Sequence, residues 1–373
     1  MLALGWYEYR LHLGIAKYAL NAGWHLCADV TKEKMIPWGW QGDGILAWLG
    51  ADEELARFVT EMKLPTVDFS SRRPELPFAR VSIDDSASVR LVADHFLTRG
   101  MNHFMYYSAQ DNWAFEKHGE LFVNILKQAG HDCSWIRWHK SQAYSTGHTQ
   151  WRDKRRWLAV ELRKAPKPLA VFAATDDHAL EIIEVSEAIG ISVPEEISIV
   201  GMDNSLPAVE AMRTPISSVD QNFTMLGYSG AELLDQLMHG KRQPPKPILI
   251  APTGLIARKS SDLLAIDHPG LARSLRYLWT NHHKPIGVDD LARVAGMSRS
   301  GFHQAFIERI GRPPGNELNR VRMEKAKKLL MESKMKLDDL AETCGYQSAN
   351  SFWVAFRQAT GMSPRQYRQR FRR

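Results

Sequence analysis

Residues 291–314 read LARVAGMSRSGFHQAFIERIGRPP, and residues 340–364 read LAETCGYQSANSFWVAFRQATGMSP. The two stretches share a Leu-Ala pair, a glycine, two phenylalanines, a second glycine and a proline, in the same order. An Asp-Asp pair precedes each stretch, at 289–290 and at 338–339. A pattern that recurs after about fifty residues predicts two copies of one structural unit.

The first copy predicts two helices around a tight turn. Residues 288–295 form a short amphipathic pattern that Gly296 and Met297 interrupt. Ser298 is a suitable N-cap for a second helix, whose apolar positions are Phe302, Phe306 and Ile310. Gly311 and the prolines at 313–314 end that helix.

The second copy uses the same devices. A helix is expected over 337–344, a turn at Gly345-Tyr346, and a second helix after Ser348. The positions expected to face inward are Phe352, Phe356 and Ala359. Helix, glycine-containing turn and helix is the helix-turn-helix pattern.

The positive charge of the chain is concentrated in this region. Residues 271–373 hold 20 Lys and Arg against 9 Asp and Glu, a net charge of +11. Residues 1–270 hold 28 against 33, a net charge of −5. A cationic surface confined to one region is what binding to a phosphate backbone requires.

Residues 286–373 resemble an AraC-type DNA-binding domain. The resemblance includes the linking helix expected at 314–332 and the ending GMSPRQYR at 361–368. It implies two helix-turn-helix units, at 286–312 and 337–362, each of which places its second helix in a major groove of promoter DNA.

The residues expected to contact DNA point away from the apolar faces of the two second helices. An alternative is that some of them are only solvated surface. Val354 stands where family members often carry a long polar residue, which favours apolar and phosphate contacts for the second unit. The candidates are Arg299, Ser300, His303 and Gln304 in the first unit, and Ser348, Ala349, Asn350, Trp353, Val354 and Arg357 in the second.

The composition indicates a globular protein. Cys27, Cys133 and Cys344 are widely spaced and form no C-x-x-C motif, which fits a reducing compartment and no structural zinc. No apolar run approaches the roughly 20 residues that span a bilayer, and the first four residues are too short for a signal peptide. We therefore expect a soluble cytoplasmic protein with no cofactor, metal or membrane partner.

Residues 1–262 alternate short apolar runs with longer helical patterns, which predicts a parallel α/β fold. In such a fold, ligands bind beyond the carboxyl ends of the strands. Strands are expected at 2–4, 25–29, 44–48, 66–69, 80–83, 103–107, 132–137, 170–174, 197–202 and 248–251. Helices are expected at 11–22, 51–62, 86–98, 115–129, 151–164, 179–189 and 226–240.

Several phrases of this first part resemble the LacI-type and periplasmic-binding-protein sensor fold. They include FAATDDHAL at 172–180, IGISVPEEISIVGMDN at 189–204 and ISSVDQNF at 216–223. The resemblance implies a two-lobed α/β sensor over 1–262, followed by a linker at 263–272 and an all-α domain at 273–373. The first strand is short, so we expect the chain to begin late relative to that family.

The resemblance also implies a sugar held between the two lobes, bonded by carboxylates and amides and stacked on an aromatic ring. Asp176 occupies the position at which this family carries a ligand-binding carboxylate after a strand, although Asp176 could instead cap the following helix. Asp203 follows the next strand end, where it could also form a turn. The other candidates are Gln221, Lys117, Glu8 and Trp113, with Trp6 and Tyr7 as further stacking rings.

The leading hypothesis is a sugar-responsive, sequence-specific transcription regulator. The resemblance implies a homodimer, contact with RNA polymerase, activation of transcription and a xylose-like or other monosaccharide effector. One alternative is a sugar-binding protein without a DNA role, for which the +11 region would have no use. The other is a DNA-modifying enzyme with a helix-turn-helix module. We expect no enzyme, because the sequence contains no G-x-S-x-G, H-E-x-x-H or P-loop motif.

Overall fold

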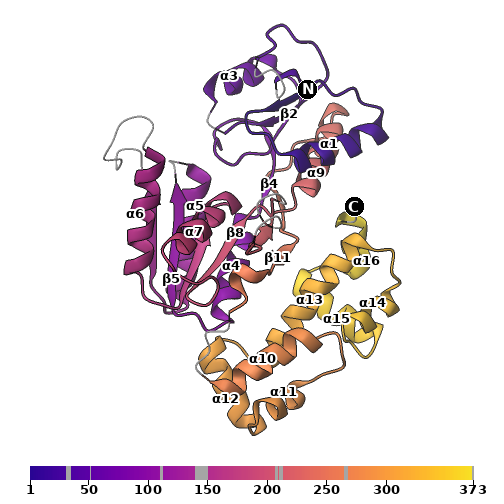
Figure 1. The fold of residues 1–373 in the computed structure, drawn as a ribbon. Coiled ribbons are helices and arrows are strands. Elements are labelled where there is room, and N and C mark those ends of the chain that lie inside the picture. The colour runs from indigo at the N-terminus through magenta and orange to yellow at the C-terminus, as the bar shows by residue number, and fades with distance from the viewer. Residues whose placement is uncertain are drawn as a thin grey trace. The chain divides into compact units, whose positions relative to one another are not determined.

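The computed structural model describes residues 1–30, 35–50, 52–109, 112–138, 150–205, 209, 213–263 and 268–371. The chain divides into two compact units. Unit 1 comprises Met1–Ser88 and Asp220–Pro252, and unit 2 comprises Val89–Val219 and Thr253–Arg373. Each unit is built on one sheet (Figure 1).

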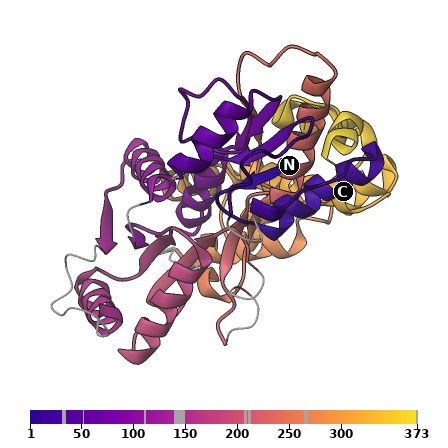
Figure 2. The same cartoon turned by 90° about the horizontal axis from the view of Figure 1, so that it is seen from above.

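Unit 1 contains a five-stranded sheet in the order β1-β2-β3-β4-β10, with parallel neighbours. Helices α1 and α9 lie side by side, as Figures 1 and 2 show. Their close approach depends on glycine: a Cβ at Gly14 would lie 2.0 Å from the Thr224 carbonyl oxygen. The strands are β1 (Leu2–Leu4), β2 (Ile45–Trp48), β3 (Thr66–Asp68), β4 (Ala79–Ile83) and β10 (Ile248–Ile250), and the helices are α1 (Tyr9–Ala22), α3 (Glu53–Met62) and α9 (Phe223–Met238).

The strand expected at 25–29 is wrong. Residues 25–28 have no regular structure, and residues 29–30 are helical. The Leu2 N–H does donate to the Cys27 carbonyl oxygen at 2.8 Å, so the segment runs beside β1. A single bond of this kind does not make a strand, because a strand needs a repeated ladder of such bonds.

Unit 2 contains a six-stranded sheet in the order β11-β9-β8-β7-β5-β6. The pairs from β9 to β6 are parallel, as expected for alternating strands and helices. Two short strands, β9 and β11, were not predicted. The strands are β5 (His103–Ala109), β6 (Cys133–Trp138), β7 (Leu169–Ala173), β8 (Ile197–Met202), β9 (Ser217–Asp220) and β11 (Gly254–Ile256); the helices are α4 (Asp85–Leu97), α5 (Trp113–Gln128), α6 (Gln150–Lys164) and α7 (Asp176–Ala188).

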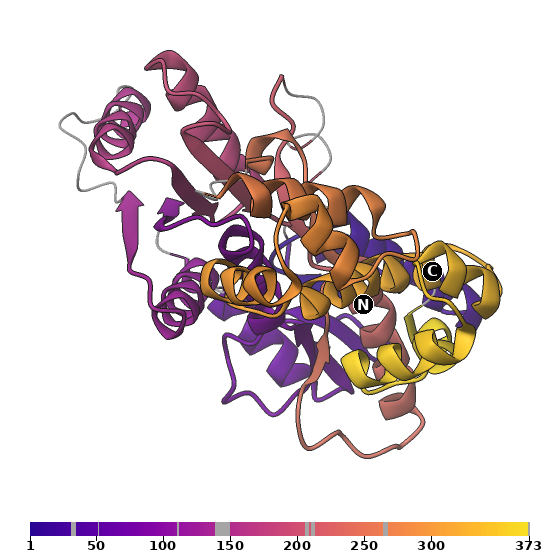
Figure 3. The same cartoon turned by 90° about the horizontal axis from the view of Figure 1, so that it is seen from below.

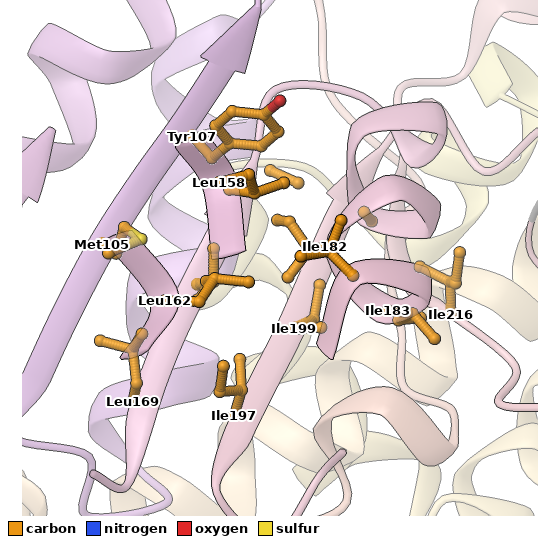
Figure 4. Packing of buried hydrophobic residues seen from close by; sticks show 14 of the residues in the cluster. Met105, Tyr107, Leu158, Leu162, Leu169, Ile182, Ile183, Ile197, Ile199 and Ile216 are labelled. Carbon is orange, nitrogen blue, oxygen red and sulfur yellow. The ribbon is translucent and has the colours of Figure 1, made fainter. Parts of the chain in front are cut away.

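Both faces of this sheet are covered. One face packs on α6 and α7 through Leu158, Ile182 and Ile199 (Figure 4). The other face packs on α4 and α5, where Phe96, Phe122 and Phe172 lie. Successive strand residues point to opposite faces, so Tyr107 joins the first cluster and Tyr106 the second.

The rest of unit 2 is helical and contains both predicted helix-turn-helix units. Figure 3 shows the first unit in orange and the second in yellow. The predicted fold class, an α/β sensor followed by an all-α domain, is confirmed. The elements are the 3₁₀ turn η2 (Lys259–Ser261) and the helices α10 (Pro269–Asn281), α11 (Val288–Ala295), α12 (Arg299–Ile310), α13 (Pro314–Glu332), α14 (Leu337–Thr343), α15 (Ala349–Thr360) and α16 (Pro364–Phe371).

The two second helices begin and end as the sequence predicts. The Ser298 hydroxyl accepts a hydrogen bond from the Gly301 N–H at 3.3 Å, and Ser348 caps α15 in the same way. Gly311 and Gly361 end the helices in the left-handed conformation. The inward position assigned to Ala359 is wrong, since its side chain is exposed. Thr360, which continues the four-residue row of Phe352 and Phe356, is the half-buried residue.

Candidate DNA-binding surface and candidate ligand site

The first recognition helix, α12, presents a polar surface. Phe302 and Phe306 are buried, and Arg299, Ser300, His303 and Gln304 are exposed. Arg299 pairs with Asp289 at 3.1 Å, and Gln304 donates to Glu308 at 2.9 Å. Exposed pairs of this kind contribute little to stability, so both side chains can exchange their partners for DNA at small cost.

The second recognition helix, α15, presents a more apolar surface. Trp353 is 37% exposed and Val354 53% exposed, and Asn350 is the exposed amide near the helix start. The Arg357 guanidinium lies over the Trp353 ring, 5.2 Å from its centroid. Ser348 is exposed, but its hydroxyl is engaged in capping the helix. Ala349 is half-buried.

Trp353 lines two hollows on this surface. One, of about 440 Å³, is mainly apolar and is lined by Leu337, Ala349, Asn350, Phe352, Trp353 and Pro364. The other, of about 340 Å³, is polar and is lined by Trp353, Arg357, Ser363, Arg365, Gln366 and Gln369. The second hollow is lined by two arginines, Arg357 and Arg365, which suits contact with phosphate.

Arg322 of α13 ties the two helix-turn-helix units together. Its guanidinium donates to the carbonyl oxygens of His282, Lys284 and Ile286, at 2.9, 2.8 and 3.1 Å. The same group lies over the ring of Tyr346, in the turn of the second unit. Gly345 packs closely against the segment 282–286, since a Cβ at Gly345 would lie 2.3 Å from the His282 carbonyl oxygen.

Two predicted sensor residues of unit 2, Asp176 and Asp203, come together beyond the ends of β7 and β8. Asp176 does not cap α7: Thr175 does, with its hydroxyl accepting from the His178 N–H at 3.2 Å. The Asp176 side chain is 2% exposed, and its Oδ2 accepts from the Ser205 N–H at 2.7 Å. A Cβ on Gly201 would lie 2.2 Å from Asp176 Oδ1, so only glycine leaves room for this carboxyl.

The electrostatics of Asp176 differ from those of an ordinary carboxylate. Burial, followed by the neighbouring charge of Asp203, raises the pKa of Asp176 to about 8. The Ser218 hydroxyl, the Ser205 N–H and the Arg258 charge act in the opposite direction. A pKa raised in this direction favours the protonated form of Asp176, in which the carboxyl can donate a hydrogen bond as well as accept one.

The backbone after β8 is strained at this point. Asp203 has φ 92° and Asn204 φ 49°, values that non-glycine residues seldom adopt. Each such residue costs about 1–3 kcal/mol, and such strain clusters at functional sites. The Asp203 N–H donates to Val219 at 3.0 Å and the Asn204 N–H to the Ser218 hydroxyl at 2.9 Å, and these bonds hold the turn.

Sequence reasoning missed Arg258 as part of this site. Its Nη2 donates to Asn204 Oδ1 at 2.9 Å, and its Nη1 donates to the Ile216 carbonyl oxygen at 2.8 Å. Arg258 follows β11, a strand that was not predicted. Its proximity to Asp176, more than eighty residues earlier, leaves no local pattern in the sequence.

Trp113 and Lys117 lie one turn apart on α5, at the carboxyl side of β5. The Lys117 ammonium is 5.8 Å from the centre of the Trp113 ring. Asn112 caps this helix by accepting from the Ala114 N–H at 2.9 Å. Both predicted side chains are half-buried.

In unit 1, Glu8 is occupied by its own helix. It caps α1 by accepting from the Arg10 N–H at 3.0 Å and pairs with the Arg10 side chain at 2.8 Å. Burial alone would raise the pKa of Glu8, but hydrogen bonds and charge from Arg10 lower it below its ordinary value. Gln221 is buried directly after β9, and Trp6 packs on Trp48 with ring centroids 4.8 Å apart.

No helix in the described part of the chain is long and apolar enough to cross a membrane. Across the residues that the structure describes, no three His, Cys, Asp or Glu side chains are grouped so as to hold a metal ion.

Comparisons with known families assign the same two parts. Residues 93–261 match the periplasmic binding protein-like domain, and residues 291–370 match a helix-turn-helix domain. The matched ranges contain Asp176 and Asp203 in the first case and both recognition helices in the second.

Two relatives extend over most of the chain. The xylose operon regulatory protein of Escherichia coli K12 is 27% identical over 88% of this chain and 84% of its own length. The protein of the same name from Haemophilus influenzae is 25% identical over 87% and 84%. A solved structure titled "structure of xylose-binding transcription activator xylR" covers 100% of this chain and 98% of its own, with a TM-score of 0.60 and 23% identity. The chain is therefore a DNA-binding transcription regulator that carries a periplasmic-binding-protein-like domain and a helix-turn-helix domain, and it is similar to the xylose operon regulatory proteins.

Proposed function

We propose that this regulator responds to a monosaccharide of the xylose class and activates transcription as a cytoplasmic homodimer that contacts RNA polymerase. Residues 1–262 form the sensor, 263–272 the linker and 273–373 the DNA-binding domain. The protein has no catalytic role in this proposal. The observation that carries the sugar response is the buried carboxyl pair of Asp176 and Asp203 at the strand ends of a sensor fold.

The chemistry of the pair suits a sugar. A sugar hydroxyl both donates and accepts, and each buried hydroxyl needs a partner for both roles. A protonated Asp176 beside Asp203 offers a donor and several acceptors within one site. In the proposal, Lys117 and Trp113 add a charge and a stacking ring from α5. Glu8 and Gln221, which belong to unit 1, are further candidates for sugar binding.

On the DNA side, we assign base contacts to Arg299, Ser300, His303 and Gln304 of α12. From the second unit, Asn350 and Trp353 contact bases, Arg357 contacts phosphate, and Ser348 lies at the helix start. The exposure of these side chains supports the assignment. The relatives of this chain are transcription regulators, and no similarity supports the two alternatives considered above.

A thermal-shift screen tests the sugar response. Purified full-length protein is heated with xylose, arabinose, ribose, glucose or galactose. A ligand at a hundred times its Kd stabilises the folded state by about 2.7 kcal/mol. We expect the melting temperature to rise with at least one pentose; no rise with any monosaccharide would contradict the sugar assignment.

A pair of substitutions at Asp176 tests the site. Asp176→Ala removes donor and acceptor together and should abolish the sugar-dependent shift. Asp176→Asn keeps one of each and should retain part of it. Both variants should bind non-specific DNA as the wild type does, and loss of that binding would mean that Asp176 is needed for folding instead.

A further inference from the structure

A continuous series of polar contacts leads from the carboxyl pair toward the DNA-binding domain, all within unit 2. It begins at Arg258, whose side chain donates to Asn204 next to Asp203. The backbone N–H of Arg258 donates to the Ser217 hydroxyl at 2.7 Å, and that hydroxyl donates back to the Arg258 carbonyl oxygen at 3.0 Å. Side chain and backbone of one residue thus link the ligand site to Ser217.

The series continues through two buried groups. The Ser261 hydroxyl donates to Ser217 Oγ at 2.7 Å, and His95 Nε2 lies 2.7 Å from Ser261 Oγ. Because the Ser261 proton is used on Ser217, His95 is the donor in its bond to Ser261. Ser217 and Ser261 are fully buried and His95 almost so, which excludes water as a competing partner.

His95 lies at the C-terminal end of α4, where the sensor lobe contacts the DNA-binding domain. One residue earlier, Asp94 pairs with Arg312 at 2.9 Å, in the turn between α12 and α13. Four residues later, the Arg99 guanidinium lies 4.4 Å from the centre of the Trp279 ring of α10. Two contacts to the DNA-binding domain therefore flank the histidine.

The DNA-binding side of this contact is a cluster of charges around the buried Glu317. Glu317 of α13 is fully buried and pairs with Arg320 at 2.7 Å and with Arg312 at 3.6 Å. Arg312 thus divides its guanidinium between Glu317 in its own domain and Asp94 in the sensor lobe. Burial, together with the charges of Arg99 and Arg320, lowers the pKa of His95 well below its ordinary value, so the histidine is neutral.

We propose that this series, from Arg258 through Ser217 and Ser261 to His95, couples sugar binding to the docking of the DNA-binding domain on α4. The proposal rests on the sugar response proposed above. A ligand at Asp203 changes the hydrogen bonds available to Asn204 and Arg258. That change reaches the end of α4, where Asp94 contacts Arg312 of the first helix-turn-helix unit and Arg99, just beyond α4, contacts Trp279 of α10. Docked and released arrangements of that unit are the two states that the sugar biases.

The test measures operator affinity by fluorescence anisotropy with and without saturating sugar. The ratio of the two affinities reports the coupling, and it equals the effect of DNA on sugar affinity. Asp94→Asn removes the sensor-lobe charge that pairs with Arg312 and leaves its pair with Glu317 in place, without altering any residue that could contact DNA. Ser261→Ala cuts the series in its middle. We expect each variant to move the ratio at least threefold toward one, while each still binds both sugar and operator.

Asp132→Asn serves as the matched control, because it removes the charge of an exposed aspartate on the same lobe. It should leave the ratio within twofold of the wild type. An unchanged ratio in both Asp94→Asn and Ser261→Ala would overturn the proposal.

Hydrogen exchange gives a readout that needs no sugar. Amides of α10 and α12 should exchange faster in Asp94→Asn than in the wild type or in Asp132→Asn. Equal exchange in all three proteins would also overturn the proposal. A wild type that ignores every sugar but shows the faster exchange in Asp94→Asn would refute the sugar response and keep the docking contact.

Discussion

The two helix-turn-helix units share one internal design and differ in the surface that they present. Each second helix begins at a serine cap, buries two phenylalanines four residues apart and ends at a left-handed glycine. The exposed side of α12 carries Arg299, His303 and Gln304, and that of α15 carries Trp353 and Val354. The two units therefore share the positions that stabilise the unit and differ at the positions that face outward.

This difference implies a division of labour on DNA. Arginine and amide side chains can make paired hydrogen bonds to base edges, which distinguish one base pair from another. Tryptophan and valine cannot, but they can contact thymine methyl groups, and Arg357 can neutralise a phosphate. We expect the first unit to supply most of the sequence discrimination and the second most of the non-specific affinity.

The largest effect should come from removing the core of one unit at a time. Phe306→Ala and Phe356→Ala each delete a fully buried ring, at a cost of about 3–5 kcal/mol. Loss of the first unit should abolish discrimination between operator and scrambled DNA, and loss of the second should weaken binding to both. Denaturant unfolding and anisotropy titrations measure the two effects. Identical DNA-binding profiles for the two variants would contradict the assignment of sequence discrimination to the first unit and non-specific affinity to the second.

Substitutions of single exposed side chains should distinguish the roles of the two units in DNA binding. Arg299→Ala should reduce discrimination by about 1–3 kcal/mol if the arginine forms a paired contact with guanine. Trp353→Ala should cost about 1 kcal/mol, the value of a partly buried apolar contact, and mainly at sites with thymine. Competition titrations with single-base operator variants measure both. A larger loss of discrimination from Trp353→Ala than from Arg299→Ala would reverse the assignment.

Arg357→Ala should weaken binding to every sequence alike. A phosphate contact carries no base information, and its loss should reduce the slope of log affinity against log salt by about 0.9. Titrations at several salt concentrations, on operator and scrambled DNA, give that slope. Gln358→Ala, at the next exposed position of α15, is the control and should leave the slope unchanged.

The smallest effect should come from the caps, and here the two units should agree. Ser298→Ala and Ser348→Ala each remove a hydroxyl that accepts a backbone N–H, at a cost of about 1 kcal/mol. Thermal unfolding measures the loss. Values that differ by much more than this between the two variants would show that the shared internal design is only superficial.

Local patterns predicted the helical region well, because its determinants are close in sequence. The bounds of α11 and α13 match the expected 288–295 and 314–332, and both serine caps lie where the sequence placed them. The prediction that Ala359 faces inward was wrong, because the row of side chains at four-residue spacing continues through Thr360. The short strands β9 and β11 have too few residues for a periodic signal to emerge.

The candidate ligand site could be predicted only in part. Asp176 and Asp203 follow strand ends, and parallel strands bring their carboxyl ends to one edge of the sheet. The structure then showed that Thr175 takes the capping role that competed for Asp176. Arg258 and His95 could not be found in this way, because their partners lie 54 and 166 residues away. The ligand assignments and the domain boundaries remain predictions.

The contacts of Arg322 constrain the spacing between the two DNA segments that the recognition helices contact in an operator. A single guanidinium holds three carbonyl oxygens of the segment that leads into the first unit and the Tyr346 ring of the second, so the two recognition helices keep one separation. An inserted base pair would rotate one recognition box about 34° around the duplex relative to the other. A promoter with such an insertion could contact only one of the two recognition helices at a time. The spacing between the two DNA segments that the helices contact is therefore as important for recognition as their base sequences.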